Sequence, residues 1–185
     1  DDAIRNFEAM GYGMGSAAAR LLSSVAAMRL VRLDLADERL AAARSEITAL
    51  GTDLTDDLDS RQLELDLLAG SATVDRCRLL YDQFGPGHPL RARAARCLAG
   101  ALIDHHDDDA VVEVLTAELA SPGCTGFERA LTCHTLLRVL PDGPDARNRA
   151  DEMRAIFVSL GIVRVPPLRF TDLSEFAEAG LSTVL

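Results

Sequence analysis

The chain has no lysine and no tryptophan, and it has few aromatic residues of any kind. All 19 basic residues are arginine, and aromatic residues make up 4% of the sequence, whereas apolar residues make up 48%. Alanine and leucine must therefore supply most of a buried interior, and both are strong helix formers. We attribute the missing lysine to coding bias and give it no functional weight.

Basic residues are also outnumbered by acidic ones. The chain carries 29 aspartates and glutamates against 19 arginines, which gives a formal net charge of −10. A surface with this charge repels a phosphate backbone on average, and no basic stripe with interleaved aromatic residues interrupts it. We therefore expect no direct binding of nucleic acid.

Long apolar runs and paired cysteine motifs are missing too. No run approaches the roughly 20 residues that a membrane-spanning helix requires, and the first residues do not resemble a signal peptide. Cys77, Cys97, Cys124 and Cys133 form no CxxC motif, and each lies in or beside an apolar helical pattern. We expect reduced, buried thiols in a cytoplasmic protein without a membrane segment.

Three short segments contain residues that other proteins use for chemistry, but none of the motifs is complete. The glycine-rich stretch 11–15 has no strand pattern before it and no phosphate ligand after it, so we expect a connection between helices. The acidic and histidine-rich string 104–109 has no second ligand pair at helical spacing, so we expect a turn that caps the next helix. Cys133 and His134 are adjacent, and adjacent helical residues do not face each other. The sequence predicts no catalytic residue, no cofactor and no metal site.

One helix ending recurs along the chain: an apolar residue, two further residues, a large apolar residue and then glycine. It closes at Gly11, Gly51, Gly85 and Gly161, and a looser copy closes at Gly123. The two apolar residues share a helix face, and the glycine can adopt the left-handed conformation that terminates a helix. The intervals are 51 − 11 = 40, 85 − 51 = 34, 123 − 85 = 38 and 161 − 123 = 38 residues. A period of this length is typical of a solenoid of helix pairs.

We therefore predict an all-α fold, a right-handed solenoid of about four antiparallel helix pairs. Residues 1–14 are expected to hold the end of a preceding helix and a turn, and residues 15–161 the array. The predicted helices span residues 16–33, 37–50, 57–69, 71–84, 89–103, 108–120, 126–139 and 145–160. Residues 162–185 are expected to form a short, extended, proline-containing cap, with a final short helix at 171–179. The alternative for this last segment is an extended peptide that a partner binds.

Apolar periodicity also predicts which residues face inward. In the first predicted helix, Ser16 is expected to be the N-cap, and the inward stripe includes Leu21 and Leu22. Leu50 and Leu160, the large apolar residues of two helix endings, are expected to be buried as well.

The 34- to 40-residue helix pairs resemble tetratricopeptide repeats in their period and glycine stops. Two segments, 9–16 and 155–166, resemble the degenerate repeat arrays of large actinobacterial signalling proteins, among them LuxR-type and related STAND ATPase regulators. The resemblance implies a sensory or docking array that is attached to effector domains elsewhere.

The function we predict is a non-catalytic protein–protein interaction module of a larger signalling or transcription-regulatory protein. Outward-facing arginines of the first helix in each pair are the candidate partner-binding residues, namely Arg20, Arg61, Arg93 and Arg96. The partner would be another protein or a neighbouring domain of the same chain. Two alternatives stay open: an intramolecular regulatory domain that controls a linked ATPase, cyclase or DNA-binding effector, and a small-ligand-binding helical domain. A homodimer through the N-terminal helix is open as well.

Overall fold

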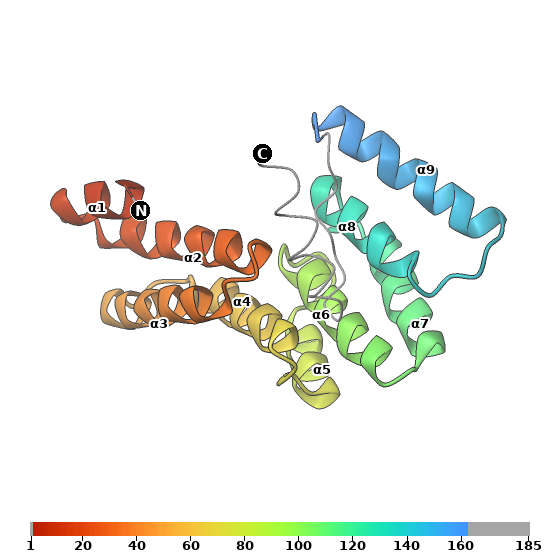
Figure 1. Ribbon diagram of the computed structural model, residues 1–185, viewed down its shortest axis with the longest axis horizontal. Coiled ribbons are helices and arrows are strands. Elements are labelled where there is room, and N and C mark those ends of the chain that lie inside the picture. Colours follow the sequence, from red (N-terminus) through yellow and green to blue (C-terminus); the bar gives the residue numbers. More distant parts are fainter. Residues whose placement is uncertain (1, 163–185) are drawn as a thin grey trace. The chain divides into compact units, whose positions relative to one another are not determined.

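A computed structural model describes residues 2–162 of the chain, and this part contains nine α-helices and no strand. The predicted all-α class is therefore confirmed. The predicted extended cap at 162–185 and the final short helix at 171–179 lie outside the described residues, apart from Ile162. The described chain divides into two compact units, residues 2–71 and residues 72–162 (Figure 1).

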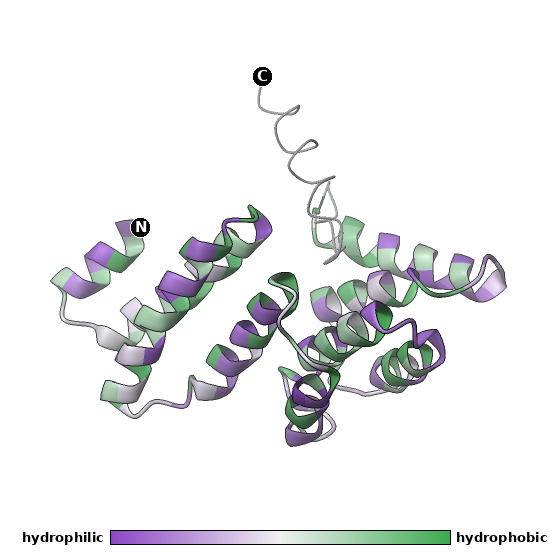
Figure 2. Cartoon of the chain, turned by 60° about the horizontal axis from the view of Figure 1, so that its bottom comes forward, coloured by the Kyte–Doolittle hydropathy of each residue, from purple (hydrophilic) through white to green (hydrophobic). Residues whose placement is uncertain are grey.

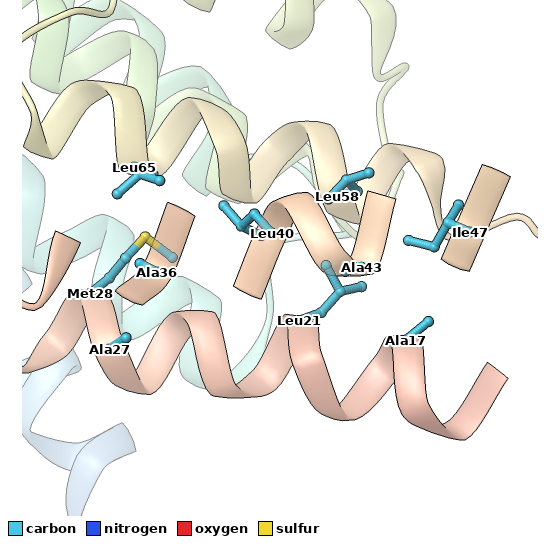
Figure 3. Close-up of a cluster of buried hydrophobic side chains, with 10 residues drawn as sticks. All are labelled: Ala17, Leu21, Ala27, Met28, Ala36, Leu40, Ala43, Ile47, Leu58 and Leu65. Carbon is cyan, nitrogen blue, oxygen red and sulfur yellow. The ribbon is translucent and has the colours of Figure 1, made fainter. Parts of the chain in front are cut away.

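The first unit contains four helices: α1 (Asp2–Ala9), α2 (Gly13–Arg29), α3 (Leu33–Leu50) and α4 (Thr55–Leu68). Helix α2 contacts the other three, and α3 also contacts α4. Because only residues 30–32 separate α2 from α3, the two helices run side by side in opposite directions (Figure 1). Their core is a cluster of ten buried residues, to which α4 contributes Leu58 and Leu65 (Figure 3).

The second unit contains five helices: α5 (Val74–Gln83), α6 (Arg91–Asp104), α7 (Asp108–Leu119), α8 (Gly126–Leu136) and α9 (Pro144–Ser159). Helix α6 contacts α5, α7 and α8, and α8 also contacts α7 and α9. Ten of the fourteen residues of α6 are buried, and six of these are alanine or glycine. Small residues let neighbouring helices approach α6 closely, which explains how a chain poor in aromatic residues fills this interior. Most other helices carry apolar and polar residues side by side, as expected for helices that are covered on one face (Figure 2).

Five helices end in the same hydrogen-bonded turn. The N–H of a left-handed residue donates to the carbonyl three residues back, and the following N–H donates to the carbonyl five residues back. The left-handed residues are Gly11, Val31, Gly70, His106 and Gly161. Helix α3 ends at left-handed Gly51 in a simpler turn, in which the N–H of Gly51 donates to the carbonyl of Ile47 at 2.9 Å. The predicted glycine terminators are thus confirmed at Gly11, Gly51 and Gly161.

The same prediction is wrong at Gly85 and Gly123, neither of which has a positive φ. Gly123 is needed for a different reason. A Cβ atom on Gly123 would lie 2.7 Å from the Cα of Gly87, in the loop between α5 and α6. The two loops therefore pack backbone against backbone, and only glycine leaves room for that approach.

Several predicted burial states and boundaries are also wrong. Helix α2 begins at Gly13, so Ser16 lies inside it and is buried; its hydroxyl donates to Glu46 Oε1 at 3.2 Å instead of capping the helix. Leu22 is 66% exposed, because the face of α2 that packs against other helices is the one that carries the buried Leu21. Leu50 and Leu160 are each about half exposed, at 47% and 49%. Helix α8 ends at Leu136, three residues before the predicted end.

Candidate functional site

The four arginines predicted to bind a partner are divided between the two units, and two of them are buried. In the first unit, Arg20 pairs with Glu8, and its Nε donates to Glu46 Oε1 at 2.8 Å. Arg61 is only 8% exposed, and its Nε donates to Asp57 Oδ2 at 3.1 Å. These contacts stabilise the packing of α2 and the first turns of α4.

In the second unit, Arg93 and Arg96 both lie on α6. Arg96 is 7% exposed. Its Nη2 donates to Glu128 Oε2 at 2.5 Å, and its Nη1 donates to Thr132 Oγ1 at 3.3 Å. Arg93 is half-buried. The expectation that Arg61 and Arg96 face outward is therefore wrong, because acidic partners draw both guanidinium groups into the fold. A partner-binding role for Arg20 and Arg93 stays a prediction.

Arg91 joins the second unit's first three helices. Its Nη1 donates to the carbonyl of Tyr81 at 3.0 Å and to that of Phe84, at the end of α5. Its guanidinium also lies 4.0 Å from the centroid of the Tyr81 ring. On the other side, its Nε lies 3.2 Å from Glu118 Oε2 of α7. A cation at the C-terminal end of α5 also compensates the partial negative charge of its free carbonyls.

Glu118 is the most deeply buried carboxylate of the described residues, at 2% exposed. Burial raises the pKa of Glu118, although the charges of Arg91 and Arg96 and a hydrogen bond from Arg91 act in the opposite direction. Desolvation therefore outweighs pairing at this carboxylate.

Arg129 has the corresponding role between α7, α8 and α9. Its Nη1 donates to the carbonyl of Leu119, at the end of α7, and its Nε donates to Glu152 Oε1, both at 2.6 Å. Arg149 also donates to Glu152, at 2.8 Å. Burial alone would raise the pKa of Glu152, but the hydrogen bonds and charges of Arg129 and Arg149 outweigh it and lower the pKa.

The cysteine and histidine residues form no reactive pair in the described part of the chain. All four cysteines are buried, and none of them forms a disulfide. Burial, followed by the nearby charge of Glu152, raises the pKa of Cys133 to about 11, so its thiol is protonated at neutral pH. Burial lowers the pKa of His134.

Within the string 104–109, residues 105–107 form the turn between α6 and α7, and the remaining residues belong to these helices. His106 is the left-handed residue after α6, and the Asp107 side chain accepts a hydrogen bond from the N–H of Ala110 at 3.3 Å, which confirms the predicted capping of α7. Within residues 2–162, no group of three or more histidine, cysteine or acidic side chains has the geometry to hold a metal ion.

The glycine-rich stretch 11–15 accommodates an aromatic pair. A Cβ atom on Gly15 would lie 2.5 Å from the Tyr12 ring and 2.7 Å from the Phe7 ring. These two rings pack edge to face, with centroids 5.7 Å apart. Gly15 therefore serves helix packing. The expected connection between helices is shorter than predicted, because α2 already begins at Gly13 and only Gly11 and Tyr12 of this stretch lie outside it.

Two pockets of the described residues lie in the second unit, and Leu140 lines both. The first, here called the α7–α9 pocket, has a volume of about 420 Å³. Its apolar lining comes from Val112, Leu136 and Leu140, and Thr116 of α7 faces the polar residues Asp145, Asn148 and Arg149 of α9. Helix α8, which contacts both α7 and α9, contributes Leu136 to the lining.

The second pocket, here called the α8–α9 pocket, has a volume of about 460 Å³. Leu137, Leu140, Ala146 and Ala150 form its apolar lining, with Asp142, Gly143 and Arg147 around them. Sequence analysis did not anticipate either pocket, because each is formed by side chains from consecutive helices and the loop between them. The only sequence feature that could have indicated the α8–α9 pocket was the spacing of Ala146 and Ala150, two small residues one helical turn apart.

Comparison of the chain with protein-family models, with curated proteins and with solved structures gives no match. Among the described helices, none is both long enough and apolar enough to cross a membrane.

Proposed function

We propose that each unit is by itself part of a right-handed, tetratricopeptide-like solenoid of helix pairs. Within each unit, a first helix contacts both its partner and the first helix of the next pair: α2 contacts α3 and α4, and α6 contacts α7 and α8. This pattern, in which each pair touches only its neighbours, is typical of solenoids. The recurring glycine stops support the same proposal.

The function that the geometry favours is a non-catalytic protein-interaction module, and the α7–α9 pocket is its candidate binding site. The observation that carries this proposal is the mixed chemistry of the pocket lining: Thr116 of α7 and the polar residues Asp145, Asn148 and Arg149 of α9 lie beside the apolar residues Val112, Leu136 and Leu140. Apolar side chains of a partner would supply most of the affinity, and the polar residues would set its orientation. A peptide or a helix of the partner fits a site bounded by two helices.

The test compares two variants of α7 in capture experiments from the native host's lysate. Thr116 and Ala117 are adjacent and both exposed, but only Thr116 lines the pocket. Thr116→Arg should lose a partner that the parent chain captures, because the arginine fills the pocket, whereas Ala117→Arg should retain it. Equal capture by both variants would contradict the proposal. Circular dichroism of each variant checks that the fold is retained.

A second candidate function is the binding of a small ligand in the same pocket. The volume of about 420 Å³ falls in the range of roughly 300–1,000 Å³ that is typical of ligand sites. A ligand would raise the unfolding temperature of the parent chain and of Ala117→Arg but not that of Thr116→Arg. A screen of host metabolites that finds no such difference would count against this alternative.

We also propose that the module belongs to a larger cytoplasmic signalling protein, as the resemblance to actinobacterial regulators implies. The captured partner would then be either a separate protein or an effector domain of the same chain. Mass spectrometry of the captured material distinguishes the two, because the second case returns only peptides of the parent protein.

A further inference from the structure

The α7–α9 pocket carries both signs of charge beside its apolar lining. Among the described residues that line it, only Asp145 and Arg149 are charged. They are four residues apart on α9, so they lie on the same face of the helix, one turn from each other. The ion pair of Arg149 is nevertheless with another residue, because its Nη1 donates to Glu152 Oε2 at 2.8 Å.

That ion pair does not neutralise the positive charge at this end of the pocket. Glu152 also accepts a hydrogen bond from Arg129 Nε at 2.6 Å, so two guanidinium groups share one carboxylate. One positive charge of the three residues therefore remains uncompensated. The Arg149 side chain is 31% exposed, which leaves it accessible to a ligand in the pocket.

The negative charge of the pocket is unpaired. Within residues 2–162, the Asp145 carboxylate forms no ion pair and no side-chain hydrogen bond. Thr116 and Asn148 also line the pocket, and a hydroxyl and an amide can each donate and accept hydrogen bonds. A molecule in this pocket would thus meet one negative charge, one positive charge and neutral hydrogen-bonding groups, all beside an apolar surface.

We propose that the α7–α9 pocket binds a zwitterionic apolar ligand, an amino acid or dipeptide with an aliphatic side chain. Its ammonium group would pair with Asp145 and its carboxylate with Arg149, and its side chain would lie against Val112, Leu136 and Leu140. A ligand with a single charge would leave one charge of the pocket unmatched. This inference rests on the second candidate function, the binding of a small ligand in this pocket.

A titration of the full chain with L-leucine, followed through the backbone amide signals of Thr116 and Asn148 in NMR spectra, tests the proposal. We expect saturable shifts. Isocaproate lacks the ammonium group of leucine and isoamylamine lacks its carboxylate, so each should bind at least roughly tenfold more weakly. Glycine, which has both charges but no side chain, should also bind more weakly. Leucylglycine offers the same chemistry as a dipeptide, and the tighter of the two zwitterions identifies the source of the ligand.

Two aspartates provide a matched pair of variants. Asp145→Asn removes the negative charge of the pocket, whereas Asp142→Asn makes the same change at an exposed residue that does not line it. Asp145→Asn should weaken the binding of L-leucine roughly tenfold but not that of isocaproate, which has no ammonium group to lose a partner. Asp142→Asn should bind L-leucine as the parent does. Both aspartates are exposed, and circular dichroism checks that the fold of each variant is retained.

Three results would overturn the proposal: no saturable shift with either zwitterion, equal affinity for L-leucine and isocaproate, or the same affinity for L-leucine in both aspartate variants. The underlying functions are tested separately, with Thr116→Arg and Ala117→Arg. A different metabolite that stabilises the parent chain but not Thr116→Arg would leave the second candidate function in place while this inference fails. Partner capture that depends on Thr116, without binding of either zwitterion, would support the interaction module alone.

Discussion

Single arginines determine much of the packing in this protein. Arg91 and Arg129 each donate to the last carbonyls of one helix and pair with a glutamate on another. Such pairs are costly to bury unless their hydrogen bonds are made. The cost of burial dominates at Glu118, whereas the arginine contacts dominate at Glu152. Their environments shift the two pKa values in opposite directions, although both carboxylates face an arginine.

The opposite shifts predict opposite effects of pH on stability. The pKa of Glu118 is raised in the folded state, so above pH 4.5 the folded protein holds a proton that the unfolded chain has released. The contribution of Glu118 to the free energy of unfolding therefore falls as pH rises through the folded pKa. Glu118→Gln should remove this decline. The pKa of Glu152 is lowered, so it contributes stability that is present above pH 4.5 and lost as pH falls through its folded pKa.

Urea denaturation of both glutamine variants, at a series of pH values around 4.5, measures these effects. Glu152→Gln should lose stability relative to the parent at neutral pH and approach it in acid, whereas Glu118→Gln should gain relative to the parent as pH rises. The same pH dependence for both variants would contradict the assignment.

Two adjacent histidines allow a test of backbone conformation. Both are exposed, but His106 has a φ of 58° whereas His105 has a φ of −95°. A left-handed residue with a Cβ costs roughly 1–2 kcal/mol, which exceeds the roughly 0.4–1 kcal/mol by which glycine stabilises the unfolded chain. His106→Gly should therefore raise the free energy of unfolding by about 0.5 kcal/mol, and His105→Gly should lower it. Urea denaturation measures both, and a loss of stability in both variants would show that His106 is not strained.

Burial of individual side chains was the hardest property to predict from the sequence. The acidic partner of Arg96 lies on the next first helix, 128 − 96 = 32 residues away. Periodicity places a residue on a helix face, but it does not show which faces a neighbouring helix will cover. Arg61 and Arg96 were therefore expected to be exposed, and Leu22 buried, and the structure reverses all three.

At the scale of the element, the helices themselves were well predicted. Their apolar spacing and terminal glycines are local properties, so the predicted helices recur as α2 to α9 with shifted ends. The glycine rule was wrong where a glycine serves a contact between loops. Gly85 and Gly123 both follow a proposed helix ending, but only Gly123 lies against another backbone.

This difference between two glycines predicts different effects of alanine. Gly123→Ala should lower the free energy of unfolding by roughly 1–3 kcal/mol, because the new Cβ forces the two loops apart. Gly85→Ala meets no atom within 4 Å and needs no positive φ, so it should leave the stability unchanged or raise it by up to about 1 kcal/mol. Thermal and urea denaturation measure both. Equal losses in the two variants would contradict the close approach of Gly123 to Gly87.

At the scale of the whole molecule, composition predicted the fold class but not the two pockets. A chain rich in alanine and leucine and poor in aromatic residues forms helices that pack closely, as α6 does. The pockets depend on the angles and loops that separate α7, α8 and α9, and these follow from packing between elements.

The central claim is that a partner binds in the α7–α9 pocket, and the arginine surface is the competing hypothesis. The most direct measurement compares partner capture by Thr116→Arg, Ala117→Arg and Arg93→Glu, with the fold of each checked by circular dichroism. The account predicts that capture is lost only with Thr116→Arg. Loss with Arg93→Glu, together with normal capture by Thr116→Arg, would contradict it and assign binding to the α6 surface.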